Sequence, residues 1–229
     1  MQNVTNSTVH KQEEMAKLEA DVREAITHSG DVKETVRQLT LKAMHAKSLD
    51  PQSIGRIATA VMQGVHDGTQ QKLEQASEQS HVAQAQIIHA VSGLDTAFAQ
   101  VAEASKLALE EAAGKAQQFS SEELTKTRAD LETLESLFLD ILQHTSTAAK
   151  GVIAETFNDL LSHAKRNGTA IGAQLKETLA TFTQQISSVG HTQLEAGVQL
   201  AQVTADLLHK IATGVLTGVA EQSKQDKNK

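Results

Sequence analysis

The sequence of 229 residues contains no cysteine, no tryptophan and no tyrosine, and five phenylalanines are its only aromatic residues. The absence of cysteine excludes disulfides and cysteine metal sites, and it fits a reducing compartment. A compact enzyme of this length normally uses aromatic side chains to fill its core and to shape its pocket. Alanine, threonine, serine and glutamine are abundant instead. This composition favours a non-catalytic protein built from thin, closely packed helices.

Clustered positive charge and long apolar runs are also missing. The net charge is −7 and the basic residues are scattered, so a nucleic-acid partner is not expected. Residues 1–14 are polar and show no signal-peptide pattern. The longest stretch without Lys, Arg, Asp or Glu runs from Thr178 to Leu194, and its Thr, Gln, Ser and His residues are too polar for hydrocarbon. We therefore expect a cytoplasmic protein with no transmembrane segment.

The single proline, Pro51, stands at the start of a long helical pattern. Asp50 is a good N-cap, and proline is favoured at the first helical position. From Ile54 to Ala116 the apolar and small residues recur at steps of three and four, which indicates a helix rather than a strand. The pattern predicts one helix from Pro51 to about Gln118, on the order of 100 Å long at 1.5 Å per residue. A helix of that length predicts a rod-shaped molecule.

Four further helices are predicted from the same periodicity and from their end signals. Gly30 with Asp31, Ser120 with Glu123, and Gly168 mark the turns between them. The expected ranges are 9–28, 32–47, 121–166 and 169–222. The predicted fold class is all-α, an elongated antiparallel helical bundle with a small N-terminal helical head and a long three-helix stalk. The expected divisions are a disordered N-terminus (1–8), the head (9–72), the stalk (73–222) and a disordered tail (223–229).

Two glycines lie close to the expected junction between head and stalk. Gly64 and Gly68 fall inside the long helical pattern, where each glycine costs about 1 kcal/mol relative to alanine if exposed. The sequence therefore predicts a bend or soft joint at residues 63–68.

Histidine is frequent enough that a metal site has to be considered. Glu78 and His81 form a Glu-x-x-His pair, and antiparallel packing would bring Asp159 and His163 to the same height. The alternative is ordinary surface pairing, since Asp159 and His163 are spaced i,i+4 with the acid first. There is also no nucleophile elbow and no phosphate-binding loop. We expect no catalytic residue, no cofactor and no metal, with these four residues as the weak metal candidates.

Long segments of the sequence lack formal charge. None occurs from Gln79 to Leu94, and Glu195 is the only one from Thr178 to Ala205. Helix faces of Thr, Ser, Gln and Ala are suited to packing against another helix or a mildly hydrophobic surface. Gly214 and Gly218 have the spacing that allows helices to approach closely. We name Gly214, Gly218, Phe182 and Ile186 as candidate interaction residues in a homo-oligomer or at a polymer-granule or lipid surface.

Two amphipathic segments resemble those of phasins, bacterial proteins that coat polyhydroxyalkanoate storage granules. They are Ala97-Phe98-Ala99-Gln100-Val101-Ala102-Glu103-Ala104 and Leu179-Ala180-Thr181-Phe182-Thr183-Gln184-Gln185-Ile186. The resemblance covers roughly residues 80–215 and is compositional, with no motif that transfers a functional residue. It implies a cytosolic, non-catalytic, oligomeric protein that works through amphipathic faces.

The leading hypothesis is a non-enzymatic helical protein that self-associates or coats a weakly hydrophobic surface such as a storage granule. One alternative is a membrane-active, toxin-like bundle that opens to expose its helices to lipid. The other is a ferritin-like metal-binding bundle.

Overall fold

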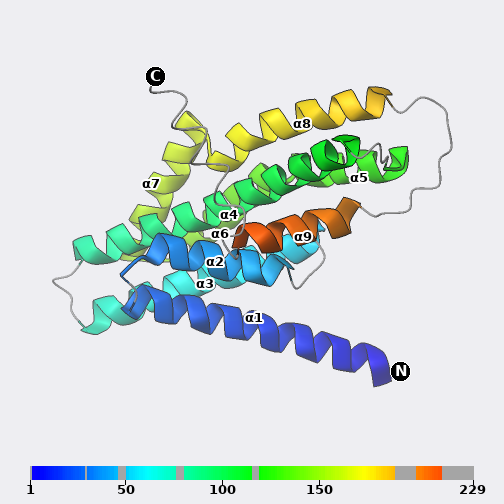
Figure 1. The fold of residues 1–229 in the computed structure, drawn as a ribbon. Helices are drawn as coiled ribbons and strands as arrows, with labels where there is room; N and C mark the ends of the chain where they lie inside the picture. The colour runs from blue at the N-terminus through cyan, green and yellow to red at the C-terminus, as the bar shows by residue number, and fades with distance from the viewer. Residues whose placement is uncertain are drawn as a thin grey trace.

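The computed structural model describes residues 2–28, 30–45, 50–75, 80–114, 119–188 and 200–212. Over these ranges the chain forms helices and no strand, which confirms the predicted all-α class (Figure 1). The helices are α1 (Gln2–His28), α2 (Val32–His45), α3 (Pro51–Gln75), α4 (Ser80–Gly114), α5 (Ser121–Glu132), α6 (Leu134–Ala148), α7 (Gly151–Asn167), α8 (Ala170–Ser188) and α9 (Leu200–Ala212).

Several helix ends form where the local sequence predicts them. Side-chain oxygens of Asp31, Asp50 and Ser120 each accept a hydrogen bond from the backbone amide three residues on, at 3.0, 2.9 and 3.1 Å. These bonds satisfy amides of the first turn that have no partner within the helix. Gly168 follows α7 with a φ of 82°, a conformation that favours glycine. The predicted starts of α2, α3 and α5 and the end of α7 are therefore confirmed.

The predicted continuous helix from Pro51 to Gln118 is wrong. The chain forms α3 and α4, which pack against each other and run in opposite directions (Figure 1). Residues 76–79 between them lie outside the described residues. The apolar stripe of a single long helix could be buried fully only by other chains. When the chain folds back on itself, the stripes of α3 and α4 are buried within one chain. The rod-shaped molecule expected from that helix is replaced by a helical hairpin covered by its neighbours.

At residues 63–68, where a bend or soft joint is predicted, α3 continues through both glycines without interruption. Helix α1 packs along α3 at this point. A Cβ atom on Gly64 would lie 2.5 Å from the Glu19 carbonyl oxygen, and one on Gly68 would lie 2.8 Å from Cβ of Ile26. The two glycines therefore permit the close approach of α1 rather than a soft joint.

Helix α4 lies at the centre of the fold. It contacts α2, α3, α7, α8 and α9, and one hydrophobic cluster contains buried residues from every described helix. All five phenylalanines are buried, and the rings of Phe98 and Phe138 meet edge to face with centroids 6.3 Å apart. The expected boundary between head and stalk at residues 72 and 73 falls inside α3, and the cluster extends across it.

The predicted helix from 121 to 166 is divided into three. Thr133 separates α5 from α6, and Ala149 with Lys150 separates α6 from α7, where Gly151 has a φ of 56°. Helices α6 and α7 pack against each other, and buried residues of all three segments belong to the core cluster.

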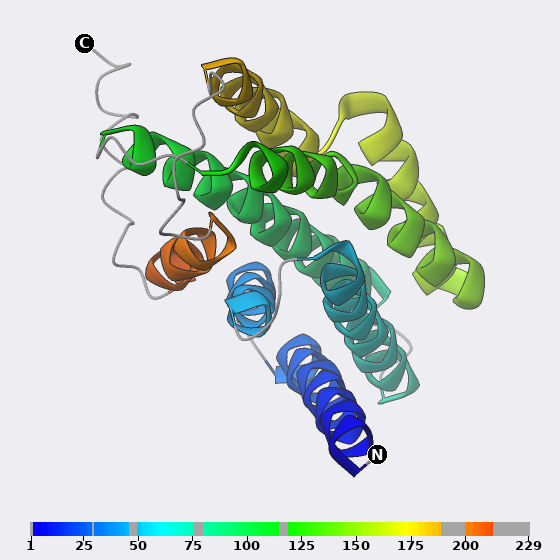
Figure 2. The ribbon, with the colours of Figure 1, turned by 90° about the vertical axis from the view of Figure 1, so that its right-hand side faces the viewer.

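The predicted helix from 169 to 222 is replaced by α8 and α9. Figure 2 shows these two helices on different sides of α4, and both contact it. Residues 189–199 and 213–229 lie outside the described residues, including the predicted tail 223–229.

The expected disorder of residues 1–8 is not observed over residues 2–8, because α1 begins at Gln2. No proline or glycine occurs in α1, and extending an existing helix costs far less than nucleating one. The part of α1 that packs on α3 therefore allows the helix to extend through the polar residues 2–8.

Candidate functional site

The first half of α4 presents an uncharged, partly apolar surface. Its exposed residues between positions 80 and 100 are His81, Val82, Ala85, Ile88 and His89, which we call the α4 ridge. Val82 and Ile88 are the exposed large hydrophobic side chains of the described residues, at 47% and 45% exposure. No Lys, Arg, Asp or Glu occurs between Ser80 and Leu94.

The helical period explains why these residues face outward. Ala83, Ile87, Ala90 and Leu94 are all buried, and they form the stripe that packs into the core. The ridge occupies the opposite side of the same helix. Its apolar side chains do not pack in the core, so they are candidates for contact with a binding partner.

A groove of about 730 Å³ runs beside the ridge, between α4, α6 and α7. Ile88 lines it from α4, while Phe138 and Leu142 of α6 and Leu160 of α7 supply further apolar lining. The polar lining includes His163. The groove is partly open to solvent. Asp95, Asp159 and Arg166 also line it, so the groove carries charge whereas the ridge does not.

Three of the four weak metal candidates lie within the described residues, where they are not grouped into a metal site. His81 is exposed on α4, Asp159 and His163 are exposed on α7, and Glu78 lies outside the described residues. The Asn167 side-chain amide donates a 2.9 Å hydrogen bond to Nδ1 of His163. Across the part of the chain that the structure describes, no three His, Cys, Asp or Glu side chains are grouped to hold a metal ion.

A partly buried carboxylate lines the groove. Asp95 of α4 accepts hydrogen bonds from the backbone amides of Ala170 at 2.9 Å and Ile171 at 3.1 Å. Burial raises the pKa of Asp95, and the negative charge of Glu135 raises it further, while the two amides and Lys33 act in the opposite direction.

Glu135 of α6 acts at the same helix start. The Thr169 hydroxyl donates a 2.6 Å hydrogen bond to Glu135 Oε1, and the Gly172 amide donates to the Thr169 hydroxyl at 2.9 Å. The first turn of α8 is thus held by carboxylates from two other helices. Because the polar atoms of this turn are used for capping, these hydrogen bonds stabilise the start of α8 and its attachment to α4 and α6.

Two of the predicted interaction residues, Phe182 and Ile186, lie within the described residues. Phe182 is fully buried in the core, and Ile186 is partly buried and packs against it. Gly214 and Gly218 lie outside the described residues. The exposure of Val82 and Ile88 is not among the features predicted from the sequence. The available signal was that both lie off the buried stripe, within a segment that has no charge.

The fold and this surface define the protein as an all-α helical bundle with an exposed apolar ridge. The chain belongs to a family of unknown function (DUF6781), which it matches over residues 8–225. No curated protein and no solved structure matches it. Within the described residues, no helix combines the length and the apolar character needed to cross a membrane.

Proposed function

We propose that the protein is a non-catalytic helical protein that acts by apolar association, through the α4 ridge, with another chain or with a weakly hydrophobic surface. The observation that carries the proposal is the exposure of Val82 and Ile88 on a helix segment without charge. Removing such apolar area from water contributes about 25 cal/mol per Å². Charged residues around a binding ridge would oppose this contact, and the ridge has none.

A polymer granule of the kind that phasins coat is one surface with the required chemistry. The resemblance of residues 97–104 and 179–186 to phasin helices supports this possibility, although Phe98 and Phe182 within them are buried here. The coating hypothesis therefore depends on the ridge rather than on those segments. A cytoplasmic location agrees with the absence of cysteine and remains a prediction from the sequence.

The proposal is tested by placing charge on the ridge. The double variant Val82→Glu/Ile88→Glu should lower both self-association and adsorption to polyhydroxyalkanoate particles by about tenfold or more, because two carboxylates would have to be desolvated. Light scattering over a concentration series measures the first property, and depletion of protein from a particle suspension measures the second.

The matched control is Gln143→Glu/Thr147→Glu, which adds the same charge to exposed positions of α6. It should behave like the unmodified protein in both measurements. Equal behaviour of all three proteins would show that the ridge takes no part in association, and the proposed function would be abandoned.

A further inference from the structure

The five exposed residues of the α4 ridge are arranged symmetrically about Ala85. Val82 and Ile88 stand three residues before and after it, and His81 and His89 stand four residues before and after it. Steps of three and four keep all five on one helix face. The residue types are symmetrical as well, since the order is histidine, β-branched apolar, alanine, β-branched apolar, histidine.

We propose that the ridge docks against the same ridge of a second copy of this chain, with the two α4 helices antiparallel and a two-fold axis at Ala85. This arrangement places Val82 of each copy beside His89 of the other, and Ile88 beside His81, on the two sides of the central Ala85 pair. A two-fold interface uses one self-complementary patch, which is what the symmetry of the ridge supplies. The proposal rests on the proposed function and identifies the partner.

Charge and size favour a second copy as the occupant. The net charge of −7 makes contact between two copies unfavourable over most of the surface, but the segment from Ser80 to Leu94 brings no formal charge into the interface. Alanine at the centre lets two helices approach to about 8 Å between axes. Ile88 also lines the groove beside the ridge, so His81 of the second copy would lie at the mouth of that groove.

The extent of the patch predicts how tight the dimer is. Five ridge residues and the groove edge cover less than the roughly 800 Å² per partner of a standard stable interface. We therefore expect a reversible dimer with a dissociation constant on the order of micromolar, populated where the protein is concentrated.

Because the chain contains no cysteine, one introduced thiol reports on the interface alone. With axes about 8–10 Å apart and Cα atoms about 2.3 Å from each axis, the two copies of residue 85 come within disulfide range. The full-length Ala85→Cys protein is incubated with oxidised glutathione, which takes two electrons and two protons from the paired thiols and becomes two reduced glutathione molecules. Covalent dimer is measured by non-reducing electrophoresis, and circular dichroism checks that each variant is folded.

The matched control is Thr147→Cys, at an exposed position of α6. Ala85→Cys should form covalent dimer at least about tenfold faster than this control, because the dimer holds the two thiols together at a high effective concentration. Equal rates would overturn the proposal.

Register is tested with Val82→Cys and His89→Cys. The antiparallel dimer predicts that a mixture of these two variants links Cys to Cys between unlike chains faster than Val82→Cys links to itself, because the two copies of residue 82 lie about 9 Å apart along the axis. Faster linkage of Val82→Cys alone would mean parallel helices and would overturn the proposal.

Failure here is distinguishable from failure of the proposed function. If Ala85→Cys fails to link while Val82→Glu/Ile88→Glu still reduces adsorption to polymer particles, the second copy is rejected and the apolar binding function stands. If neither experiment shows an effect, both are rejected.

Discussion

The Asp95 carboxylate of α4 accepts a 2.9 Å hydrogen bond from the Ala170 backbone amide at the start of α8. The first amides of a helix have no intrahelical partner, so they are usually satisfied by a residue just before the helix. Here a residue from another helix also supplies acceptors, and the cap of α8 becomes a tertiary contact. Loss of the Asp95 side chain should therefore affect both the start of α8 and its attachment to α4.

The first prediction concerns the stability of the Asp95→Ala variant. It loses two hydrogen bonds to backbone amides, and we expect the free energy of unfolding to fall by about 1–2 kcal/mol in urea titrations. The control Asp140→Ala removes an exposed carboxylate from α6 and should change stability by less than about 0.5 kcal/mol. A loss as small as that of the control would mean that solvent replaces the Asp95 cap without cost.

The second prediction follows from the raised pKa of Asp95. A carboxyl group whose pKa is higher in the folded state binds its proton more tightly there. Its contribution to stability is therefore fully present below the usual aspartate pKa of about 4 and is lost as the pH rises through the folded-state value. Asp95→Asn cannot ionise. The free energy of unfolding of the unmodified protein minus that of Asp95→Asn should fall as the pH rises from about 4 toward neutrality. An increase with pH would show that the hydrogen bonds to Ala170 and Ile171 outweigh burial.

The third prediction compares two glycines of α3. A Cβ on Gly64 would lie 2.5 Å from the Glu19 carbonyl oxygen, a backbone atom that moves only if α1 moves. Gly64→Ala should lower stability by about 1–3 kcal/mol despite the higher helix propensity of alanine. At Gly55 the nearest atom to a new Cβ is Cδ1 of Leu137, at 3.4 Å. Gly55→Ala should therefore stabilise the protein by up to about 1 kcal/mol. Similar effects of both substitutions would contradict the close packing of α1 on α3.

The fourth prediction is a coupling between Gly172 and Glu135. A Cβ on Gly172 would overlap the Glu135 carboxylate, which would have to move away from the Thr169 hydroxyl. Gly172→Ala should be destabilising in the unmodified protein and neutral or stabilising in the Glu135→Ala background. A double-mutant cycle in urea should give a coupling energy of about 1–2 kcal/mol. Additive effects would show that the side chain of Glu135 relaxes freely.

Features that depend on neighbouring residues could be predicted from the sequence. Asp31, Asp50 and Ser120 cap helices where expected, because a cap needs only a short side chain and a free amide three residues on. The apolar period identified buried positions such as Ile87 and Phe98 for the same reason. Both kinds of signal are contained within one or two helical turns.

Features that depend on distant segments could not be predicted in this way. The reversal between α3 and α4 follows from the gain in burying two stripes against each other, and nothing within either stripe marks where the chain turns. The low helix propensity of Gly64 is evident from the sequence, and it predicts a soft joint. The close packing of Glu19 that Gly64 permits involves another helix, so it cannot be predicted from the residues around Gly64.

The candidate site shows the same limit. The uncharged segment around Val82 was evident from the sequence, but the exposure of its side chains depends on which faces α3 and α7 cover. Phe182 was named as an interaction residue and is a core residue, because a large apolar side chain on a stripe is used first for folding.

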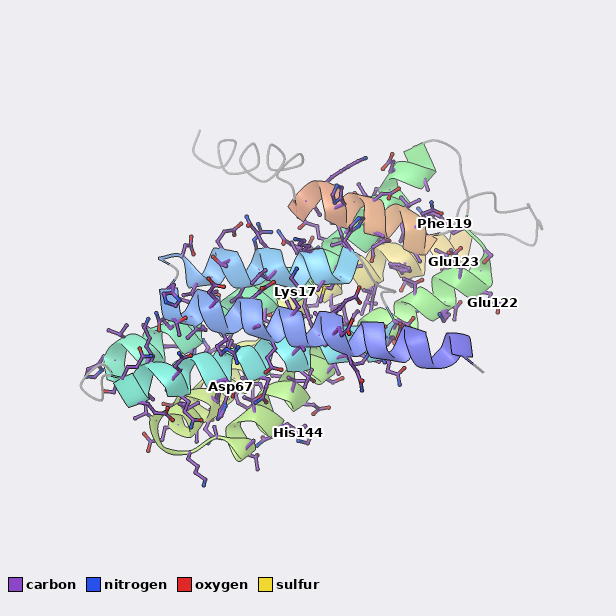
Figure 3. All side chains as sticks on the ribbon, turned by 90° about the horizontal axis from the view of Figure 1, so that it is seen from below. Lys17, Asp67, Phe119, Glu122, Glu123 and His144 are labelled. Atoms are coloured by element: carbon purple, nitrogen blue, oxygen red, sulfur yellow. The ribbon has the colours of Figure 1, made fainter. Side chains whose placement is uncertain are left out.

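The last prediction concerns α9, whose start is capped as that of α8 is. Glu123 of α5 lies beside α9, and its Oε1 accepts a 2.6 Å hydrogen bond from the Leu200 amide (Figure 3). Because each cap belongs to one helix, Glu123→Ala should increase amide hydrogen exchange across 200–212 and leave 170–188 unchanged, while Asp95→Ala should do the reverse.

The matched control for α9 is Glu122→Ala, an exposed neighbour on the same turn of α5 (Figure 3). It removes an equal charge without removing the cap, so exchange in both helices should stay as it is in the unmodified protein. Joint acceleration of α8 and α9 by either cap variant would mean that the two helices open as one cooperative unit. Separate acceleration would show that two carboxylates, Asp95 and Glu123, hold them to the bundle independently.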